Sequence, residues 1–201
     1  MRKGEVTRQK ILDCAIELVA EVGYTNTTTQ AILDRSRVSR GSLLHQFGTR
    51  HELMVTTGHE AVHKMLASIT VRMTEAGGPL EGFFHYPDIL WDVLTEPPAL
   101  AFYEILMASR WDQELFEGLK GEILEAELTI ENSIQALARR YGMTDVAGYL
   151  VDVGIVNDAM QGLAARRSLS HTPDRIEAER QVLRDWHTRA LNTRLPKKHR
   201  R

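Results

Sequence analysis

Apolar residues recur at intervals of three and four along most of this chain of 201 residues. In residues 5–22 this spacing forms a single stripe of Ile11, Leu12, Ala15, Ile16, Val19 and Val22. Such a period is typical of an amphipathic α-helix, and no strand-length segment alternates with a period of two. The sequence therefore predicts an all-α protein. With 43% apolar residues, the chain can also bury a sizeable core.

Glycine and proline residues divide the predicted helices. Gly23 ends the first helix, and Gly77-Gly78-Pro79 ends the fourth. We expect about nine helices, at residues 5–22, 29–35, 40–46 and 50–75, between Pro87 and Pro97, and at residues 100–110, 112–140, 145–168 and 174–194.

Charge divides the chain unevenly. Residues 1–50 carry eight Lys or Arg against five Asp or Glu, residues 51–190 carry twelve against twenty-two, and residues 191–201 carry five against none. A basic N-terminal region followed by an acidic region is suited to a protein that binds a polyanion through its N-terminal region. We predict three parts: residues 1–48, residues 49–196 and a basic, mobile tail at residues 197–201, which has no apolar residue to anchor it.

The single cysteine, Cys14, excludes an internal disulfide framework and a CxxC motif, and it suggests a reducing compartment. The N-terminus leads into a charged amphipathic stretch rather than an apolar signal sequence, and no run approaches the ~18 apolar residues of a membrane span. These features predict a soluble, cytoplasmic protein with no membrane partner.

Thr28 and Ser39 offer side-chain oxygens that can cap two short helices, at residues 29–35 and 40–46. A tight turn would join these helices behind a longer helix, which is the pattern of a helix-turn-helix unit. In such a unit the second helix fits the DNA major groove. Here it opens with Ser39-Arg40-Gly41-Ser42, which are small, polar or basic residues that allow close approach. Leu43 and Phe47 can anchor its opposite side against Ile32 and the first helix.

Residues 23–53 resemble the DNA-binding region of the tetracycline-repressor (TetR) family. The residues that match the family's pattern are Gly23, Tyr24, Thr27, Thr28, Ile32, Val38, Ser39, Gly41, Leu43, Phe47 and Leu53. The resemblance implies an N-terminal three-helix DNA-binding domain at residues 1–48 and a larger helical ligand-binding and dimerisation domain at residues 49–196. It also implies that Thr28 and Arg50 hold DNA phosphates. The residues that it places at the groove are Arg37, Ser39, Arg40, Gly41, Ser42 and His45.

The chain departs from the family pattern at four positions. Arg37 replaces a turn glycine and must bear any left-handed backbone conformation there. Leu44 replaces a tyrosine that often donates to phosphate, and Gln46 replaces a histidine. Arg50 replaces a lysine and keeps its charge.

A competing motif, His-Glu-Ala-Val-His at residues 59–63, matches HExxH. On a helix, His59 and His63 could hold zinc while Glu60 activates water. A zinc hydrolase needs a third ligand as well, and no HxxGxxH continuation follows, because Leu66 and Ile69 occupy those positions. We therefore predict no enzyme, no metal and no cofactor. The metal-dependent hydrolase and a helical binding protein without a DNA role remain the alternatives.

A regulator needs a second site, for its effector. Residues 83–116 gather most of the large aromatic residues, and pockets in helical domains are mostly apolar with a few polar groups. Ordinary core packing is the alternative. The residues that we predict to line an effector pocket are His63, Trp91, Phe102, Tyr103, Met107, Asn157 and Gln161.

The last two predicted helices suggest a homodimer. Gly154, Asp158 and Gly162 form a small-residue stripe that allows close helix approach. On the next helix, a second stripe is formed by Ile176, Leu183, Trp186 and Ala190. Burial against the chain's own helices is the alternative. The resemblance to the TetR family also implies such a dimer. It further implies a ligand-responsive repressor that a small, largely apolar effector releases from a palindromic double-stranded DNA operator, with the helix at residues 50–75 as the lever.

Overall fold

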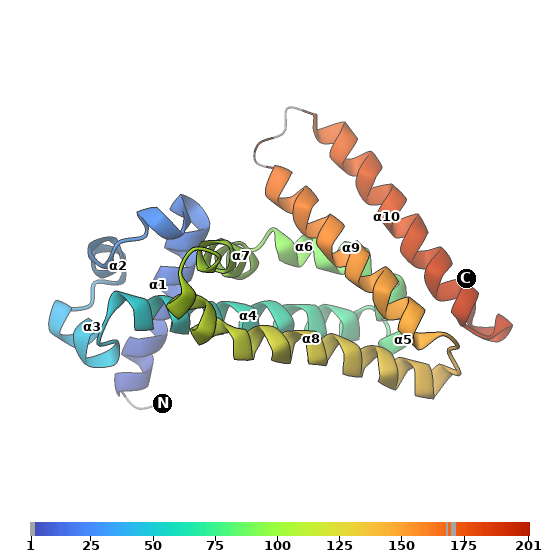
Figure 1. Ribbon diagram of the computed structural model, residues 1–201, viewed down its shortest axis with the longest axis horizontal. Helices are drawn as coiled ribbons and strands as arrows, with labels where there is room; N and C mark the ends of the chain where they lie inside the picture. Colours follow the sequence, from blue (N-terminus) through green and yellow to red (C-terminus); the bar gives the residue numbers. More distant parts are fainter. Residues whose placement is uncertain (1–2, 168, 170–171) are drawn as a thin grey trace. The chain divides into compact units, whose positions relative to one another are not determined.

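The structure, a computed structural model, describes residues 3–167, 169 and 172–201. Over these residues it consists of ten α-helices and one 3-10 turn, without a strand (Figure 1), which confirms the predicted all-α class. The helices form two compact units. Outside the described residues lie Met1 and Arg2 and, at the expected connection between the last two helices, Ser168, Ser170 and His171.

The first unit consists of Met1–Leu66 and Glu96–Ala126. Helix α1 is its centre, since α1 contacts α2, α3 and α7. The predicted stripe on α1 is buried, with Ile11, Ala15 and Val19 fully enclosed, except at Val22, which is 43% exposed. The helices of this unit are α1 (Lys3–Asn26), α2 (Thr29–Ser36), α3 (Arg40–Gln46), the first part of α4 (Arg50–Glu75), α7 (Pro97–Ser109) and the first part of α8 (Gln113–Tyr141).

Local signals set the boundaries of the first helices. Gly23 has φ 81° and ψ 164°, so it breaks the helical backbone of α1 where the sequence predicts an end. The Thr28 hydroxyl accepts a hydrogen bond from the Ala31 amide (3.1 Å) and caps α2. The Ser39 hydroxyl accepts one from the Ser42 amide (3.2 Å) and caps α3. Both predicted N-caps are therefore confirmed.

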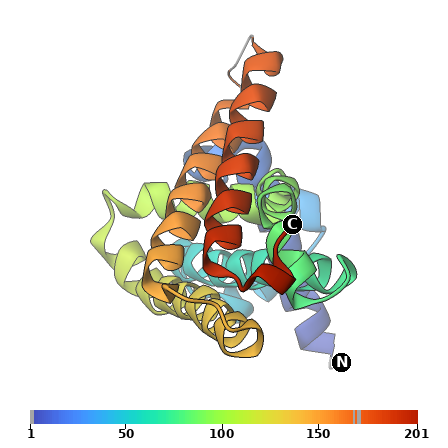
Figure 2. The same ribbon diagram turned by 90° about the vertical axis from the view of Figure 1, so that its right-hand side faces the viewer.

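The second unit consists of Ala67–Thr95 and Glu127–Arg201. In it, α9 and α10 lie side by side (Figure 2), and α6 packs against both. Its helices are the end of α4, α5 (Pro79–Phe84), α6 (Tyr86–Leu94), the end of α8, α9 (Val146–Arg167), α10 (Pro173–Arg194) and the turn η1 (Lys197–His199).

A buried polar cluster ties three elements of this second unit together. The His187 ring on α10 is fully buried, and its Nε2 lies 2.7 Å from the Phe83 carbonyl of α5 and 3.2 Å from the Tyr149 hydroxyl of α9. The Tyr86 hydroxyl donates to Asn157 Oδ1 (2.8 Å). These bonds satisfy polar groups that burial would otherwise leave unpaired.

Helix α5 is an element that the sequence did not predict. Gly77-Gly78-Pro79 is a helix stop, but Pro79 is also the first residue of the next helix, where its missing N–H is no loss. The description "about nine helices" is thus short by one.

The end of the chain, which we expected to be a mobile tail, forms the turn η1. Arg200 Nε donates to the Leu195 carbonyl (2.8 Å), and the Arg201 amide donates to Asn192 Oδ1 (2.9 Å). Polar contacts thus take the place of the apolar anchor that this segment lacks. The predicted functional boundary at residue 48 is a different kind of division from these compact units and stays a prediction.

Candidate DNA-binding surface

The turn between α2 and α3 depends on Arg37. This residue has φ 56° and ψ 28°, in the left-handed region, and its amide donates to the Leu33 carbonyl (3.0 Å), which caps α2. The sequence predicts this strain, because Arg37 stands where the family has glycine. The consequence is an exposed guanidinium directly before α3.

Helix α3 presents its predicted face to solvent. Ser39, Arg40, Gly41 and His45 are exposed, and Ser42 is half-buried. A Cβ on Gly41 would meet nothing within 4 Å, so the backbone at the start of the helix is open to close approach. The structure therefore brings the predicted groove-facing residues together on α3 and in the turn before it.

The opposite side of α3 holds it in place. Leu43 and Phe47 are buried, as predicted, and Ile32 of α2 is fully buried as well. Leu44, in contrast, is 52% exposed and adds an apolar group to the outer face. A side chain of this kind can contact the methyl group of thymine but cannot donate to phosphate.

The charges on this surface are not all available to a ligand. Arg35 forms a bidentate ion pair with Glu21 (2.8 and 2.7 Å), and this pair joins α2 to α1. The hydrogen bonds from Arg35 hold the pKa of Glu21 below its usual range. Arg37 and Arg40 form no ion pair within the part of the chain that the structure describes. Two cations thus flank the start of α3 with their charge uncompensated.

The two predicted phosphate-binding residues have structural tasks in the structure. Thr28 caps α2. Arg50, at the start of α4, donates to the carbonyls of Tyr24 (3.0 Å) and Thr27 (3.3 Å), and its guanidinium lies 4.8 Å from the centre of the Tyr24 ring. Arg50 therefore fastens α4 to the connection between α1 and α2. Phosphate binding by these two residues stays a prediction.

Arg8 is a positioning residue that the sequence analysis missed. Its Nη1 donates to the Gln46 carbonyl at the end of α3 (3.2 Å), and its guanidinium lies 4.4 Å from the centre of the Phe47 ring. Arg8 thus satisfies a free carbonyl at the helix end and packs over its last turn. Thirty-eight residues separate Arg8 from Gln46, so no local pattern in the sequence reveals this pair.

The HExxH motif lies on α4 and pairs with α8. His59 Nδ1 and His63 Nε2 lie 3.6 and 3.3 Å from the carboxylate of Glu122, while Glu60 accepts from Gln9 of α1 (2.7 Å). Within the described part of the chain, no group of three or more His, Cys, Asp or Glu residues could hold a metal ion. The motif therefore joins helices within the first unit.

The predicted effector residues fall into two groups. His63, Phe102, Tyr103 and Met107 lie in the first unit, and the last of them is 48% exposed. The second unit contains Trp91, Asn157 and Gln161. Asn157 is engaged by Tyr86, and the Trp91 ring is covered by the Arg180 guanidinium (4.3 Å). The structure does not gather these residues into one pocket.

The predicted dimer residues also fall into two groups, which differ in exposure. Gly154, Asp158 and Gly162 lie on an exposed face of α9. Ile176, Leu183 and Ala190 of α10 are 5–8% exposed, so they pack inside their own unit, and Trp186 is half-buried. The same spacing therefore serves packing within the chain, and a partner contact of the three buried residues stays a prediction.

No helix in the described part of the chain is long and apolar enough to cross a membrane.

Residues 11–56 match the family model described as bacterial regulatory proteins, tetR family. An uncharacterized HTH-type transcriptional regulator of Mycobacterium tuberculosis is 25% identical to this chain over 179 residues. The aligned region covers 89% of this chain and 91% of the relative. The fold is similar to that of a transcriptional regulator from Rhodococcus sp. Rha1, with a TM-score of 0.72, 17% identity and coverage of 93% and 97% of the two chains.

A second solved structure with a similar fold is a putative transcriptional regulator from Saccharomonospora viridis in complex with choline. It has a TM-score of 0.69 and 14% identity, and covers 90% and 95% of the two chains. At these identities the two structures show the shared fold. The family match at residues 11–56 includes the exposed helix-turn-helix, and the alignment with the mycobacterial relative extends over most of the chain. The family match at residues 11–56, the mycobacterial relative and the shared fold together support a TetR-family DNA-binding transcriptional regulator.

Proposed function

We propose that the protein binds a palindromic DNA operator as a homodimer and represses transcription until a small effector releases it. The observation that carries the DNA-binding part is the exposed face of α3, where Arg37 and Arg40 remain uncompensated beside small residues. Base edges in the major groove can be read only by side chains that reach them, and α3 offers such side chains at its open start. A protein that binds an operator in this way would act in the cytoplasm, where the chromosome lies.

Regulators of this family bind DNA operators and small-molecule effectors, and they act as regulators rather than as enzymes. The choline complex of the Saccharomonospora protein supports an effector site in a fold of this kind. Helix α4 contributes residues to both compact units, so it can link the two activities. An effector that binds more tightly to one conformation of the dimer lowers operator affinity by the same coupling free energy.

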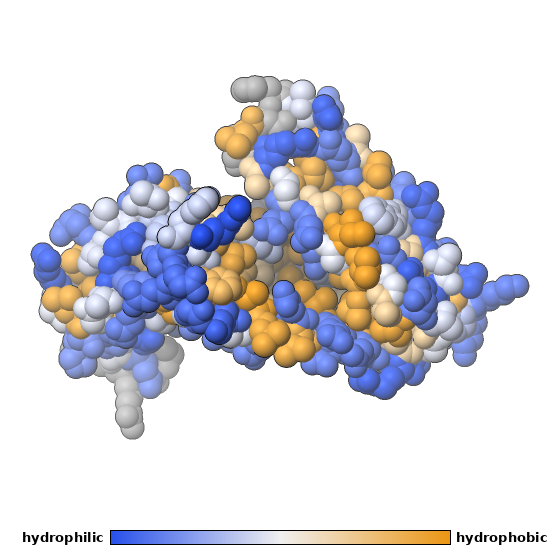
Figure 3. All heavy atoms as spheres, in the orientation of Figure 1, coloured by the Kyte–Doolittle hydropathy of each residue, from blue (hydrophilic) through white to orange (hydrophobic). Residues whose placement is uncertain are grey.

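Dimerisation through α9 accounts for its exposed face. Val151 and Ile155 are 62% and 40% exposed, and they flank the exposed Gly154. Figure 3 shows apolar surface over this helix. A two-fold axis at this face would duplicate α3 and match a palindromic operator.

The test uses the palindrome in the DNA upstream of the protein's own gene, labelled for fluorescence anisotropy. Arg40→Ala should abolish the preference for this palindrome over unrelated DNA, a loss of about 1–3 kcal/mol for one base-reading arginine. Arg139→Ala, at an exposed arginine of α8, is the matched control and should behave as the wild type.

Affinity for any DNA should also fall steeply with salt, because phosphate binding releases counterions. Salt-independent behaviour, or unchanged operator preference in Arg40→Ala, would contradict the proposal.

A further inference from the structure

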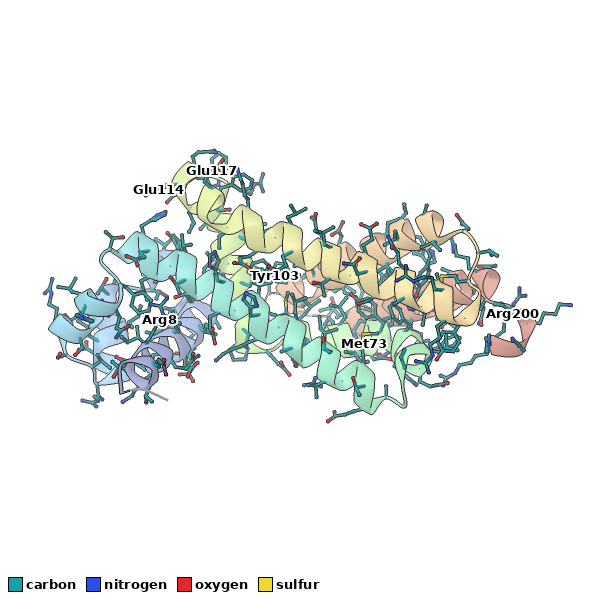
Figure 4. All side chains as sticks on the ribbon, turned by 90° about the horizontal axis from the view of Figure 1, so that it is seen from below. Arg8, Met73, Tyr103, Glu114, Glu117 and Arg200 are labelled. Carbon is teal, nitrogen blue, oxygen red and sulfur yellow. The ribbon has the colours of Figure 1, made fainter. Side chains whose placement is uncertain are left out.

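The second unit contains a cavity of about 380 Å³ that none of the predicted effector residues lines. It lies between the end of α4, the start of α5 and the end of α8, and Met73, Phe83 and Leu137 contribute apolar walls. Figure 4 labels Met73 on α4, alongside α8. The volume is in the range of small-molecule sites, which begin at about 300 Å³.

The wall formed by α5 depends on one close backbone contact. A Cβ on Gly82 would lie 2.6 Å from the Met73 carbonyl oxygen, so only glycine lets α5 pack this tightly on α4. Pro79 fixes the first turn of α5 and lines the cavity, and Phe83 is buried beside it. Well-packed helices therefore form most of the wall of this partly open cavity.

The charge in the cavity has one sign. Arg140 contributes the single charged side chain of the lining, and no carboxylate is present in it. Within the described part of the chain Arg140 forms no ion pair; its guanidinium lies 5.5 Å from the centre of the Tyr141 ring.

Two hydroxyl groups of the lining are already engaged within the chain. Thr74 donates to the Thr70 carbonyl and Ser133 donates to the Thr129 carbonyl, both at 2.8 Å. Arg140 is the charged donor of the lining that can meet a ligand. A guanidinium has five N–H donors in a planar fork that matches a carboxylate.

We propose that this cavity binds a small organic anion, with its apolar body against Met73, Phe83 and Leu137 and its carboxylate against Arg140. A cation such as choline is disfavoured by the unpaired guanidinium at the same site. The ligand is the effector of the repressor proposed above, so the inference rests on that function and adds both the site and the chemical class.

Calorimetric titration of the full-length protein with octanoate and with 1-octanol separates the charge from the apolar body. Octanoate should bind more tightly than the alcohol, and Arg140→Gln should weaken octanoate by about tenfold, as expected for one charge-assisted contact. The affinity for 1-octanol should not change. Arg139→Gln removes the neighbouring arginine, which does not line the cavity, and should leave both affinities as they are. Ala136→Trp, at an exposed lining residue, should fill the cavity and abolish both.

The inference is overturned if octanoate does not bind, if octanoate and 1-octanol bind equally, or if Arg140→Gln has no effect. Operator binding by the same variants is measured separately. Normal operator binding without octanoate binding would contradict the proposed anion site but not the proposed repressor function. Octanoate binding at Arg140 in a protein that binds no operator would contradict the repressor function but not the anion site.

Discussion

At the scale of single residues, Arg37 has a backbone conformation that lowers the stability of the fold and a side chain that is suited to DNA binding. A non-glycine residue in the left-handed region costs about 1–2 kcal/mol. The turn before α3 nevertheless holds an arginine with φ 56°. Arg37 is exposed, forms no ion pair within the described part of the chain and lies just before α3, so the proposed contact with DNA would account for the strain.

Arg37→Gly should therefore stabilise the protein and weaken its binding to DNA. The free energy of unfolding should rise by up to about 1 kcal/mol, since glycine relieves the strain but has a more flexible unfolded state. Urea unfolding and operator titration measure the two effects. Arg37→Lys keeps both strain and charge and should change neither; a fall in stability in Arg37→Gly would contradict this account.

The buried His187 should make stability depend on pH. Burial lowers the pKa of this ring, because the charged form loses its solvation and Nδ1 has no hydrogen-bond partner among the described residues. The hydrogen bond from Nε2 to the Phe83 carbonyl acts in the opposite direction and offsets only part of this shift. Its folded pKa thus lies below the ordinary value of about 6.5. The neutral ring stabilises the fold fully above that value, and this contribution is lost as pH falls through the folded pKa.

Urea unfolding at pH 7.5, 6.5 and 5.5 should show a loss of stability of up to about 1.4 kcal/mol per pH unit from this one proton. His187→Gln, which can still donate to the Phe83 carbonyl, should flatten the profile. His45→Gln, at an exposed histidine, should not. An equally steep profile in His187→Gln would mean that other groups carry the dependence.

At the scale of secondary-structure elements, α3 is too short to be stable alone, so its position depends on what it packs against. Leu43 and Phe47 fix one side of it, and Arg8 of α1 holds its last turn. Isolated helices shorter than about 12 residues are marginal in water, which makes such tertiary contacts decisive.

Arg8→Met should reduce both stability and operator affinity. It keeps an apolar stem but removes the hydrogen bond to Gln46 and the charge over Phe47, a loss of about 1 kcal/mol. Thermal unfolding and anisotropy measure the two. Lys10→Met removes one charge from an exposed position on the same helix. Equal effects of the two substitutions would show that Arg8 contributes charge alone.

At the scale of the whole molecule, the proposed function requires two copies of the chain. The exposed face of α9 is suited to this contact because Gly154 has open space above it and apolar neighbours on both sides. One α3 reads one half-site, so a dimer roughly adds the binding free energies of the two half-sites.

Gly154→Arg should give a folded monomer with much weaker operator binding. A Cβ at Gly154 meets nothing within 4 Å, so the substitution does not disturb the chain itself. Light scattering after gel filtration should report the mass of one chain, and circular dichroism should stay unchanged. Gly121→Arg on α8 also enters open space and should leave the dimer intact. A dimeric Gly154→Arg protein would exclude this face as the interface.

The sequence alone determined the helical class, the caps at Thr28 and Ser39, the break at Gly23 and the exposed start of α3. These features depend on residues within one or two turns of each other, so local spacing and hydrogen-bonding groups are enough to predict them. The tertiary structure alone decided which side of α10 is buried, how Arg8 and Arg50 are engaged, and that Arg140 lines a cavity with Met73. Helical periodicity defines a face but does not say what covers it. That choice depends on contacts between residues far apart in the chain, which exist only once the helices have packed.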